Sequence, residues 1–461
     1  MRTHCLILTL GLAVLPGAAA AKSPTPAERW RSDVEHAAAL ACVQARTLFA
    51  GTLPALEGDC AVSAFTRREI VAGIAEYAFR LSTGPGEHDL VGIHRVVQET
   101  ALYEPAPTGP PVLMTHGDVW GFDAAFLANV DSPVAPDDRA LPVFLAQNGV
   151  DVWGIDLGWT FVPASTTDFS FFAGWGMERD ARDVGLALAL VRDVRTRTGE
   201  GHGRIHLLGW SRGGHIGYAY LNAETQVPPG RRNAAGFIPV DIFLKTDVEA
   251  LRQSACVRAA AGQALIDGGT YQSTIGVLVV TLGQLAKAAP DDPSPIFPGL
   301  TNRQAALLLG AATFALFPPD QQIVPVYHFT AGTFDEFGVP TGLLYTDEAL
   351  WFDFLTGASP FQPEQEVVDG DTVLCDETDV AFDDHLGEIS VPVLYVGAGG
   401  GFGEFGVYTT TLLGSTDVQI HLVDLEPDPA RLFDFGHGDL FTAVNAESQS
   451  WQAILSWLQT H

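Results

Sequence analysis

Between residues 85 and 242 the hydrophobic pattern alternates between short apolar strands and amphipathic helices. Strands are expected at 91–97, 111–115, 150–155, 205–208 and 236–242. A helix is expected at 179–198, where Val184, Ala187, Leu188 and Val191 fall on one face, and another at 213–222. Strands that alternate with helices favour a parallel sheet, so the pattern predicts an α/β fold whose mostly parallel central sheet is flanked by helices.

The alternation stops at residue 243 and returns near residue 390. The interval 243–389 is richer in proline and contains two apolar helical stretches, 275–288 and 304–317. Strands then follow at 391–396 and 418–423, with a closing helix around 446–458. The sequence therefore predicts a core in two parts, 85–242 and 390–461, with a large cap or lid, 243–389, inserted between core strands.

Two segments precede the core. Residues 22–84 are predicted to form an N-terminal helical extension, because apolar residues between Ile70 and Tyr77 recur at helical spacing. Residues 1–21 are predicted to be a signal peptide, since Met1-Arg2 leads into an apolar run at 5–15 and small residues at 18–21. This order predicts a secreted or periplasmic protein, with a retained N-terminal anchor as the alternative.

The apolar run at 5–15 is too short for an ordinary transmembrane helix, and no other stretch of about twenty apolar residues occurs. We therefore expect no stable membrane insertion.

Four cysteines follow the predicted signal peptide. An even number in an exported chain favours two disulfides, and we expect Cys42 with Cys60 and Cys256 with Cys375; free buried thiols are the alternative. No Cys-x-x-Cys pair occurs, so neither a zinc ribbon nor a redox motif is indicated. We expect no cofactor and no metal, although the acidic run 369–384 leaves a calcium loop open as an alternative to a solvated one.

Composition narrows the class of partner. The formal charge is −30, from 25 Lys and Arg against 55 Asp and Glu, and such a surface repels phosphate backbones, so no nucleic-acid partner is expected. With 47% hydrophobic and 17% charged residues the chain can bury a large core. Composition does not indicate an oligomeric state.

The motif Gly209-Trp210-Ser211-Arg212-Gly213 fits Gly-x-Ser-x-Gly, the nucleophile elbow. An elbow holds its serine on a strained turn between a strand and a helix, and the flanking glycines let the two approach closely. The expected strand at 205–208 and helix at 213–222 supply that context. Ser211 is therefore the candidate nucleophile.

A serine hydroxyl needs a base to take its proton, and in this arrangement the base follows the last strand. His437, between Gly436 and Gly438, occupies that position. His215 is treated as a packing residue, because four residues along the helix it points away from the attacking oxygen.

An oxyanion hole needs two backbone N–H donors. We expect one from Arg212, directly after the nucleophile, and one from Asp118, in the loop after the strand 111–115. A carboxylate is unfavourable beside a developing negative charge, so the Asp118 side chain is expected to turn away. Trp210 and Trp120 are the expected substrate-binding residues.

These motifs, together with 152–156 and the strand 391–394, resemble the α/β-hydrolase superfamily on its lipase and esterase side. In that family the triad acid usually follows the strand that matches 391–396, but here a glycine run occupies 397–403 and the first acid is Glu404. The other family position is the end of the preceding core strand, which offers Asp241. Asp241 is favoured, since a core strand expected two places from the elbow would hold it rigidly.

The resemblance implies a serine hydrolase, and three readings follow. The first is a carboxylic ester hydrolase acting on an apolar acyl or polyester substrate, that is, a small-molecule or lipid-like ester. The second is a peptidase, amidase or acyltransferase of the same fold. The third is a non-catalytic binding protein. Dehalogenases and epoxide hydrolases of this fold use Asp as nucleophile, so Ser211 argues against both.

Overall fold

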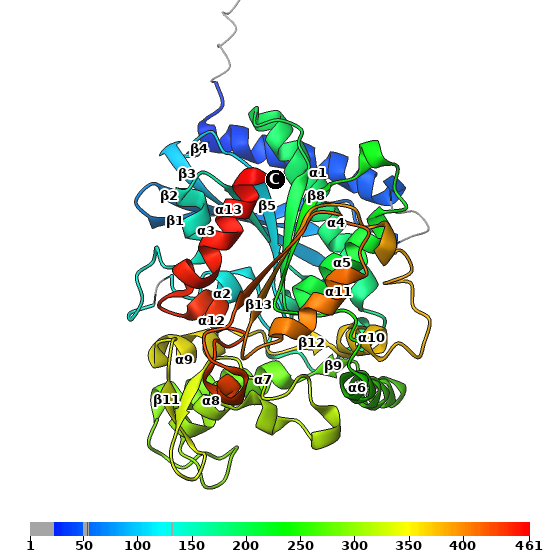
Figure 1. The fold of residues 1–461 in the computed structure, drawn as a ribbon. Helices are drawn as coiled ribbons and strands as arrows, with labels where there is room; N and C mark the ends of the chain where they lie inside the picture. Colours follow the sequence, from blue (N-terminus) through cyan, green and yellow to red (C-terminus); the bar gives the residue numbers. More distant parts are fainter. Residues whose placement is uncertain (1–22, 49–52, 54, 131) are drawn as a thin grey trace, which may run out of the picture.

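The central feature of the protein is one twisted sheet with helices on both faces (Figure 1). A computed structural model describes residues 23–48, 53, 55–130 and 132–461, so the predicted signal peptide at 1–21 lies outside the described residues. The strands of this sheet are β1 (Val62–Val71), β2 (Ile74–Ser82), β3 (Leu90–Ala101), β4 (Glu104–Pro105), β5 (Pro111–Thr115), β6 (Asp151–Asp156), β7 (Ile205–Trp210), β8 (Ala234–Val240), β13 (Val393–Ala398) and β14 (Val418–Val423).

Most of the sheet is parallel. The strands run in the order β1-β2-β3-β6-β5-β7-β8-β13-β14, with β4 paired to β3. From β6 to β14 every neighbouring pair is parallel, while β1, β2, β3 and β6 pair antiparallel. The predicted α/β class with a mostly parallel sheet is therefore confirmed. The carboxyl ends of the parallel strands meet at one edge, which is where open parallel sheets bind ligands.

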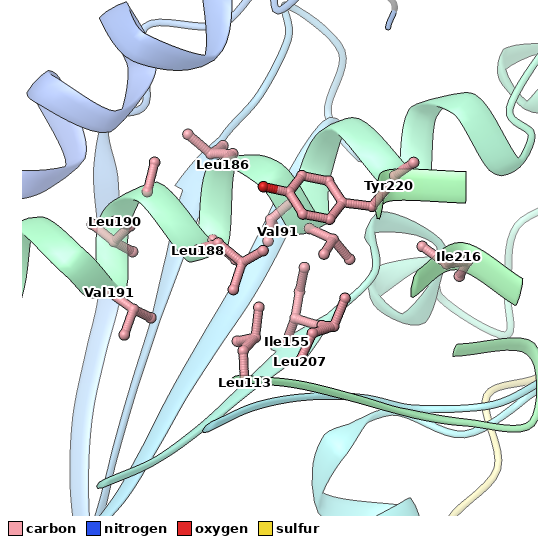
Figure 2. Close-up of a cluster of buried hydrophobic side chains, with 14 of the residues drawn as sticks. Val91, Leu113, Ile155, Leu186, Leu188, Leu190, Val191, Leu207, Ile216 and Tyr220 are labelled. Atoms are coloured by element: carbon pink, nitrogen blue, oxygen red, sulfur yellow. The ribbon is translucent and has the colours of Figure 1, made fainter. Parts of the chain in front are cut away.

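Two layers of helices bury the two faces of the sheet. On one face lie α1 (Pro26–Leu48), α4 (Met177–Thr198) and α5 (Arg212–Glu224), and on the other α2 (Phe122–Phe126), α3 (Leu141–Gln147) and α13 (Gln452–Thr460). Side chains alternate along each strand, so Leu113 of β5 joins the first layer and Met114 the second. Figure 2 shows Leu188 of α4 beside Ile155 and Leu207 of the sheet, as the predicted apolar face of that helix requires.

The segment between β8 and β13 folds beside the carboxyl ends of the parallel strands, at the lower end of the view in Figure 1. Its elements are α6 (Glu249–Asp267), β9 (Gln272–Ser273), α7 (Ile275–Ala288), α8 (Asn302–Ala311), β10 (Gly332–Phe334), β11 (Pro340–Leu343), α9 (Glu348–Thr356), β12 (Gln362–Pro363) and α10 (Glu364–Cys375). Helix α8 stops six residues before the predicted 317, because the Thr313 hydroxyl bonds the carbonyls of Leu309 and Gly310 at its end.

The predicted N-terminal helical extension is only half correct. Helix α1 ends at Leu48, and β1 and β2 form an antiparallel hairpin that extends the central sheet. The helical reading failed because Ile70, Ile74 and Tyr77 fit a helical spacing by coincidence. The alternation of buried Tyr77, Phe79 and Leu81 is the strand signal that the helical interpretation overlooked.

Two disulfides join the cysteine pairs that the sequence predicted. Cys42 of α1 is bonded to Cys60, and Cys256 of α6 is bonded to Cys375 at the end of α10. The second closes a loop of 119 residues within the segment between β8 and β13. No helix in the described ranges is long and apolar enough to cross a membrane.

Candidate active site

Ser211 lies on the sharp turn between β7 and α5. Its backbone has φ +56° and ψ −128°, a conformation that a non-glycine residue adopts only when the surrounding structure enforces it. The enforcing contacts are backbone approaches: a Cβ on Gly209 would lie 2.3 Å from the carbonyl oxygen of Gly213, and one on Gly213 would lie 2.3 Å from that of Thr115. The two glycines therefore allow the strand, the helix and β5 to meet beneath Ser211.

His437 lies in the loop before the short helix α12 (Asp439–Thr442) and is 1% exposed. Its Nδ1 lies 2.7 Å from Oδ2 of Asp241. The Trp210 ring stacks on the imidazole with centroids 5.0 Å apart, and Tyr327, Phe329 and Phe402 complete an aromatic surround. This packing leaves the ring little rotational freedom. Ser211 and His437 line the same cavity.

Asp241 follows β8 directly and is fully buried. Its carboxylate accepts hydrogen bonds from the main-chain N–H groups of Ala398, Phe402 and Gly403, at 2.7 to 3.1 Å, in addition to its contact with His437. Its own φ is +49°. Those donors belong to the end of β13 and the glycine run after it, and a Cβ on Gly401 would lie 2.0 Å from Oδ2 of Asp241. The glycine run therefore wraps around the carboxylate.

The structure brings Asp241, and not Glu404, to His437. Glu404 is exposed and borders a small acidic hollow that also contains Asp424 and Glu426. One detail of the sequence analysis is wrong, because β8 is the direct neighbour of β7 and does not lie two places away. The catalytic acid thus stays a prediction, but only one of its two candidates is in contact with the histidine.

The expected oxyanion donors also lie close to Ser211. The Arg212 N–H is in the first turn of α5, where helix geometry supplies no intrahelical partner. The loop after β5 passes so near that a Cβ on Gly117 would lie 2.8 Å from that of Ser211. Arg212 and Asp118 border the same cavity as Ser211.

The Asp118 side chain does not simply turn away as expected. It faces the Arg212 guanidinium, whose Nε donates to Oδ1 at 3.0 Å and whose Nη2 donates to Oδ2 at 3.3 Å, and it also accepts from Gln362. Burial would raise the pKa of Asp118, but the Arg212 charge and these hydrogen bonds outweigh it and hold the pKa below its ordinary value. Burial would likewise lower the pKa of Arg212, yet the Asp118 charge raises it. The pair therefore stays ionised, and the negative charge of Asp118 is compensated beside Ser211.

A cavity of about 550 Å³ opens over Ser211 between the core and the segment that follows β8. Trp120 and Trp210, the expected substrate-binding residues, both line it, and the Trp120 indole donates to the Phe354 carbonyl at 2.9 Å. Most of the lining is aliphatic or aromatic. The apolar members contributed by the segment 243–389 include Ile275, Leu278, Val279, Phe297, Leu309, Leu316, Phe317, Phe329 and Trp351.

Two other polar clusters bear on metal binding. Glu76, His94 and Asp123 lie within reach of one ion, but both ring nitrogens of His94 already contact carboxylates, Nδ1 that of Glu76 at 2.7 Å and Nε2 that of Asp156 at 2.9 Å. Arg68 pairs with Glu76 and Asp123. The cluster is therefore balanced by its own cations.

The acidic run 369–384 is also partly neutralised by side chains of the protein. Asp371 pairs with Arg258 at 2.6 Å, and Asp376 and Asp383 both pair with Lys245. These ion pairs favour neither a calcium loop nor a wholly solvated run.

Several residues near the site carried no recognised sequence signal. Tyr327, Phe329 and Phe402 surround His437 from distant parts of the chain. Asp439 holds the histidine loop, because its carboxylate accepts from the N–H of Gly436 and of Ala331, each at 2.8 Å. An acid two residues after a histidine in a glycine-rich loop is a local cue to this contact.

Comparison with known proteins shows the fold. A lipase candidate from Sulfolobus solfataricus is 18% identical, with a TM-score of 0.56, over 86% of this chain and 99% of that chain. A thermophilic esterase from Thermogutta terrifontis is 14% identical over 81% of this chain and 96% of that chain, but its TM-score of 0.36 adds nothing to the argument. No protein-family profile matches the chain, and no curated protein matches it. The chain has the α/β-hydrolase fold.

Proposed function

We propose that this protein is a serine hydrolase that cleaves carboxylic esters through an acyl-enzyme, with Ser211 as nucleophile, His437 as base and Asp241 as the acid. The observation that carries the proposal is the arrangement at one cavity. A serine held at φ +56° faces the same cavity as a buried histidine, and the Nδ1 of that histidine is fixed by a carboxylate at 2.7 Å. The fold that it shares with a lipase candidate is consistent with this chemistry.

The steps follow from the positions of these groups. Ser211 Oγ attacks the ester carbonyl carbon while His437 Nε2 takes its proton, and Asp241 stabilises the imidazolium through Nδ1–H. The oxyanion is stabilised by the N–H groups of Arg212 and Asp118. His437 then gives the proton to the leaving alcohol, and water repeats the sequence on the acyl-enzyme to release the acid and restore Ser211.

The cavity supports an apolar acyl group or polyester fragment as substrate. Its walls are mostly aliphatic and aromatic, and each methylene that leaves water for such a wall gains about 0.8 kcal/mol. In this proposal the segment 243–389 acts as a cap that supplies most of the apolar wall. The neutralised Asp118–Arg212 pair is one of its polar features beside Ser211.

We also propose that the chain is exported. The predicted signal peptide at 1–21 and the two disulfides support an oxidising compartment. Amino-terminal sequencing of the protein recovered from the periplasm or medium tests this, because a mature chain that begins near residue 21 is expected.

Ser211→Ala tests the central proposal. We expect a fluorophosphonate probe to label the wild type and the control Ser456→Ala, whose exposed serine lies on α13, but not Ser211→Ala. Turnover of p-nitrophenyl esters should fall by about 10³ to 10⁶ in Ser211→Ala, with unchanged folding. Activity of Ser211→Ala within tenfold of wild type would contradict the proposed nucleophile.

A substrate panel separates the alternatives. Hydrolysis of p-nitrophenyl esters well above that of aminoacyl anilides is expected. The reverse preference would indicate a peptidase or amidase of this fold. An unlabelled and inactive wild type would indicate a binding protein.

A further inference from the structure

An ion pair joins the two loops that carry the candidate oxyanion donors. The Arg212 guanidinium donates hydrogen bonds to both oxygens of the Asp118 carboxylate, from Nε to Oδ1 at 3.0 Å and from Nη2 to Oδ2 at 3.3 Å. These are the same two residues whose main-chain N–H groups are the candidate donors. The ion pair therefore links the elbow to the loop after β5. Asp118 and Arg212 are 94 residues apart in the sequence. A planar guanidinium fork suits this task, because it fixes the orientation of the carboxylate as well as its distance.

The Arg212 guanidinium also contacts His215. Arg212 Nη1 donates to Nδ1 of His215 at 2.9 Å, and His215 Nε2–H donates to the carbonyl of Phe243 at 2.8 Å. Burial and the Arg212 charge lower the pKa of His215 to about 3, so the ring is neutral and its Nδ1 can accept. His215, which the sequence analysis treated as packing, thus orients Arg212.

The segment between β8 and β13 also contacts this ion pair, at Asp118 through β12 and at Arg212 through α10. Gln362, the first residue of β12, is fully buried and its Nε2 donates to Asp118 Oδ1 at 2.5 Å and to Glu366 Oε2 at 3.2 Å. Helix α10 packs closely against the guanidinium, since a Cβ on Gly370 would lie 1.8 Å from Arg212 Nη1. The Asp118 carboxylate is therefore clamped between the core and this segment.

We propose that the side chains of Arg212 and Gln362 are positioning residues that hold the Asp118 main-chain N–H at the oxyanion, so that the rate of acyl transfer depends on how β12 and α10 dock onto the core. The inference rests on the proposed function and deepens it. Oxyanion donors act only when they are pre-aligned with the charge that develops in the transition state. A displacement of about 1 Å at such a donor can cost on the order of 10²-fold in rate.

Two variants with matched controls test the proposal. Gln362→Leu keeps the side-chain volume and removes the donor to Asp118, while Arg212→Met removes the fork. The controls are Gln322→Leu, whose amide donates only to main-chain carbonyls such as that of Phe317 at 2.9 Å, and Arg303→Met, which loses an ion pair with Glu348. Both control residues lie in the same segment and neither lines the cavity.

The kinetic result separates positioning from stability. We expect kcat on a p-nitrophenyl ester to fall about 10- to 100-fold in Gln362→Leu and Arg212→Met with KM within about threefold, because the lost alignment matters only in the transition state. Arg212→Lys should recover part of the loss. Each control should lower the melting temperature without changing kcat. Unchanged kcat in both test variants, a change in KM alone, or an equal fall of kcat in the controls would overturn the proposal.

Hydrogen exchange gives a readout that does not need activity. The peptide 116–120 should exchange faster in Gln362→Leu and Arg212→Met than in the wild type or the controls. The same exchange rate in all five proteins would also overturn the proposal. An inactive and unlabelled wild type would instead refute the proposed ester hydrolysis, and the exchange rates would still decide whether the two side chains hold the loop.

Discussion

Replacing Asp241 by Asn should uncouple the candidate triad without disturbing its packing. Three main-chain N–H groups, those of Ala398, Phe402 and Gly403, donate to this carboxylate. An Asn at this position must present its carbonyl oxygen to these donors, since its NH₂ group would oppose them. The NH₂ is then directed at His437 Nδ1, which must become the acceptor. The proton of a neutral ring moves to Nε2, and that nitrogen can no longer take a proton from Ser211.

The size of this effect follows from the tautomer. A wrong tautomer with intact geometry lowers kcat by about 10⁴, which corresponds to about 5 kcal/mol of transition-state stabilisation. Glu404→Gln is the matched control, because Glu404 is exposed and directed to the acidic hollow beside Asp424. Its kcat should stay within about twofold of the wild-type value, as for most surface changes far from the reacting groups.

The assay is steady-state hydrolysis of a p-nitrophenyl ester, with thermal unfolding followed by circular dichroism to show that both variants fold. If Asp241→Asn keeps a near-normal kcat and Glu404→Gln loses most of its kcat, the assignment of Asp241 as the acid is refuted. A large loss in both would mean that the loop after β13 contributes to catalysis in a way that the contact of Asp241 with His437 does not explain.

Three further predictions concern substrate, disulfides and pH. The ratio kcat/KM for p-nitrophenyl esters should rise about fourfold with each added methylene until the cavity is filled, as expected for burial at about 0.8 kcal/mol per methylene, and a strict preference for acetate would contradict the apolar cavity. Mass mapping of non-reduced protein should find both disulfides, and Cys256→Ser should lower the free energy of unfolding by about 2 to 5 kcal/mol; four alkylatable thiols in exported protein would refute the pairing. Burial raises the pKa of Asp439 from 3.8 to about 6. The folded state therefore keeps a proton that the unfolded state loses near pH 4. The contribution of this group to the free energy of unfolding is largest below pH 4 and falls by about 3 kcal/mol as the pH rises through 6. Asp439→Asn should therefore flatten the pH dependence of urea unfolding between pH 4 and 7, and an unchanged slope would disprove the shift.

Much of the core could be predicted from local pattern. The strands β5 and β14 and the helix α7 have the predicted bounds. β5 and α7 are apolar runs of suitable length, and β14 alternates between apolar and polar residues. The hairpin of β1 and β2 was missed because a short amphipathic segment can satisfy both periods. Its strand pairing with β3, which is a tertiary contact, decides between them.

Some residues of the candidate site could likewise be predicted from local pattern, whereas others depend on tertiary contacts. Ser211 and His437 could be placed from sequence because an elbow has a local signature and the order of the triad along the chain fixes where a histidine must lie. For the acid, two positions fit the order, and Asp241 is favoured only because a core strand is expected to hold it rigidly. The contact of Asp118 with Arg212 was also missed, because a side-chain pair across 94 residues leaves no trace in local pattern. Gln362 is 244 residues from Asp118 in the sequence, and the docking of β12 brings the two side chains together.

The glycine run after β13 has a physical role that its composition alone does not reveal. The first acid after β13 is Glu404, which follows the glycine run. In the structure the end of β13 and this run donate main-chain N–H groups to Asp241, and a side chain on Gly401 would occupy the space of Oδ2. A carboxylate directly after β8 can reach His437 only if the loop after β13 leaves room and satisfies its remaining lone pairs. The glycines after β13 and the carboxylate after β8 therefore form one structural unit, which fixes Asp241 in place while leaving a single oxygen directed at the histidine.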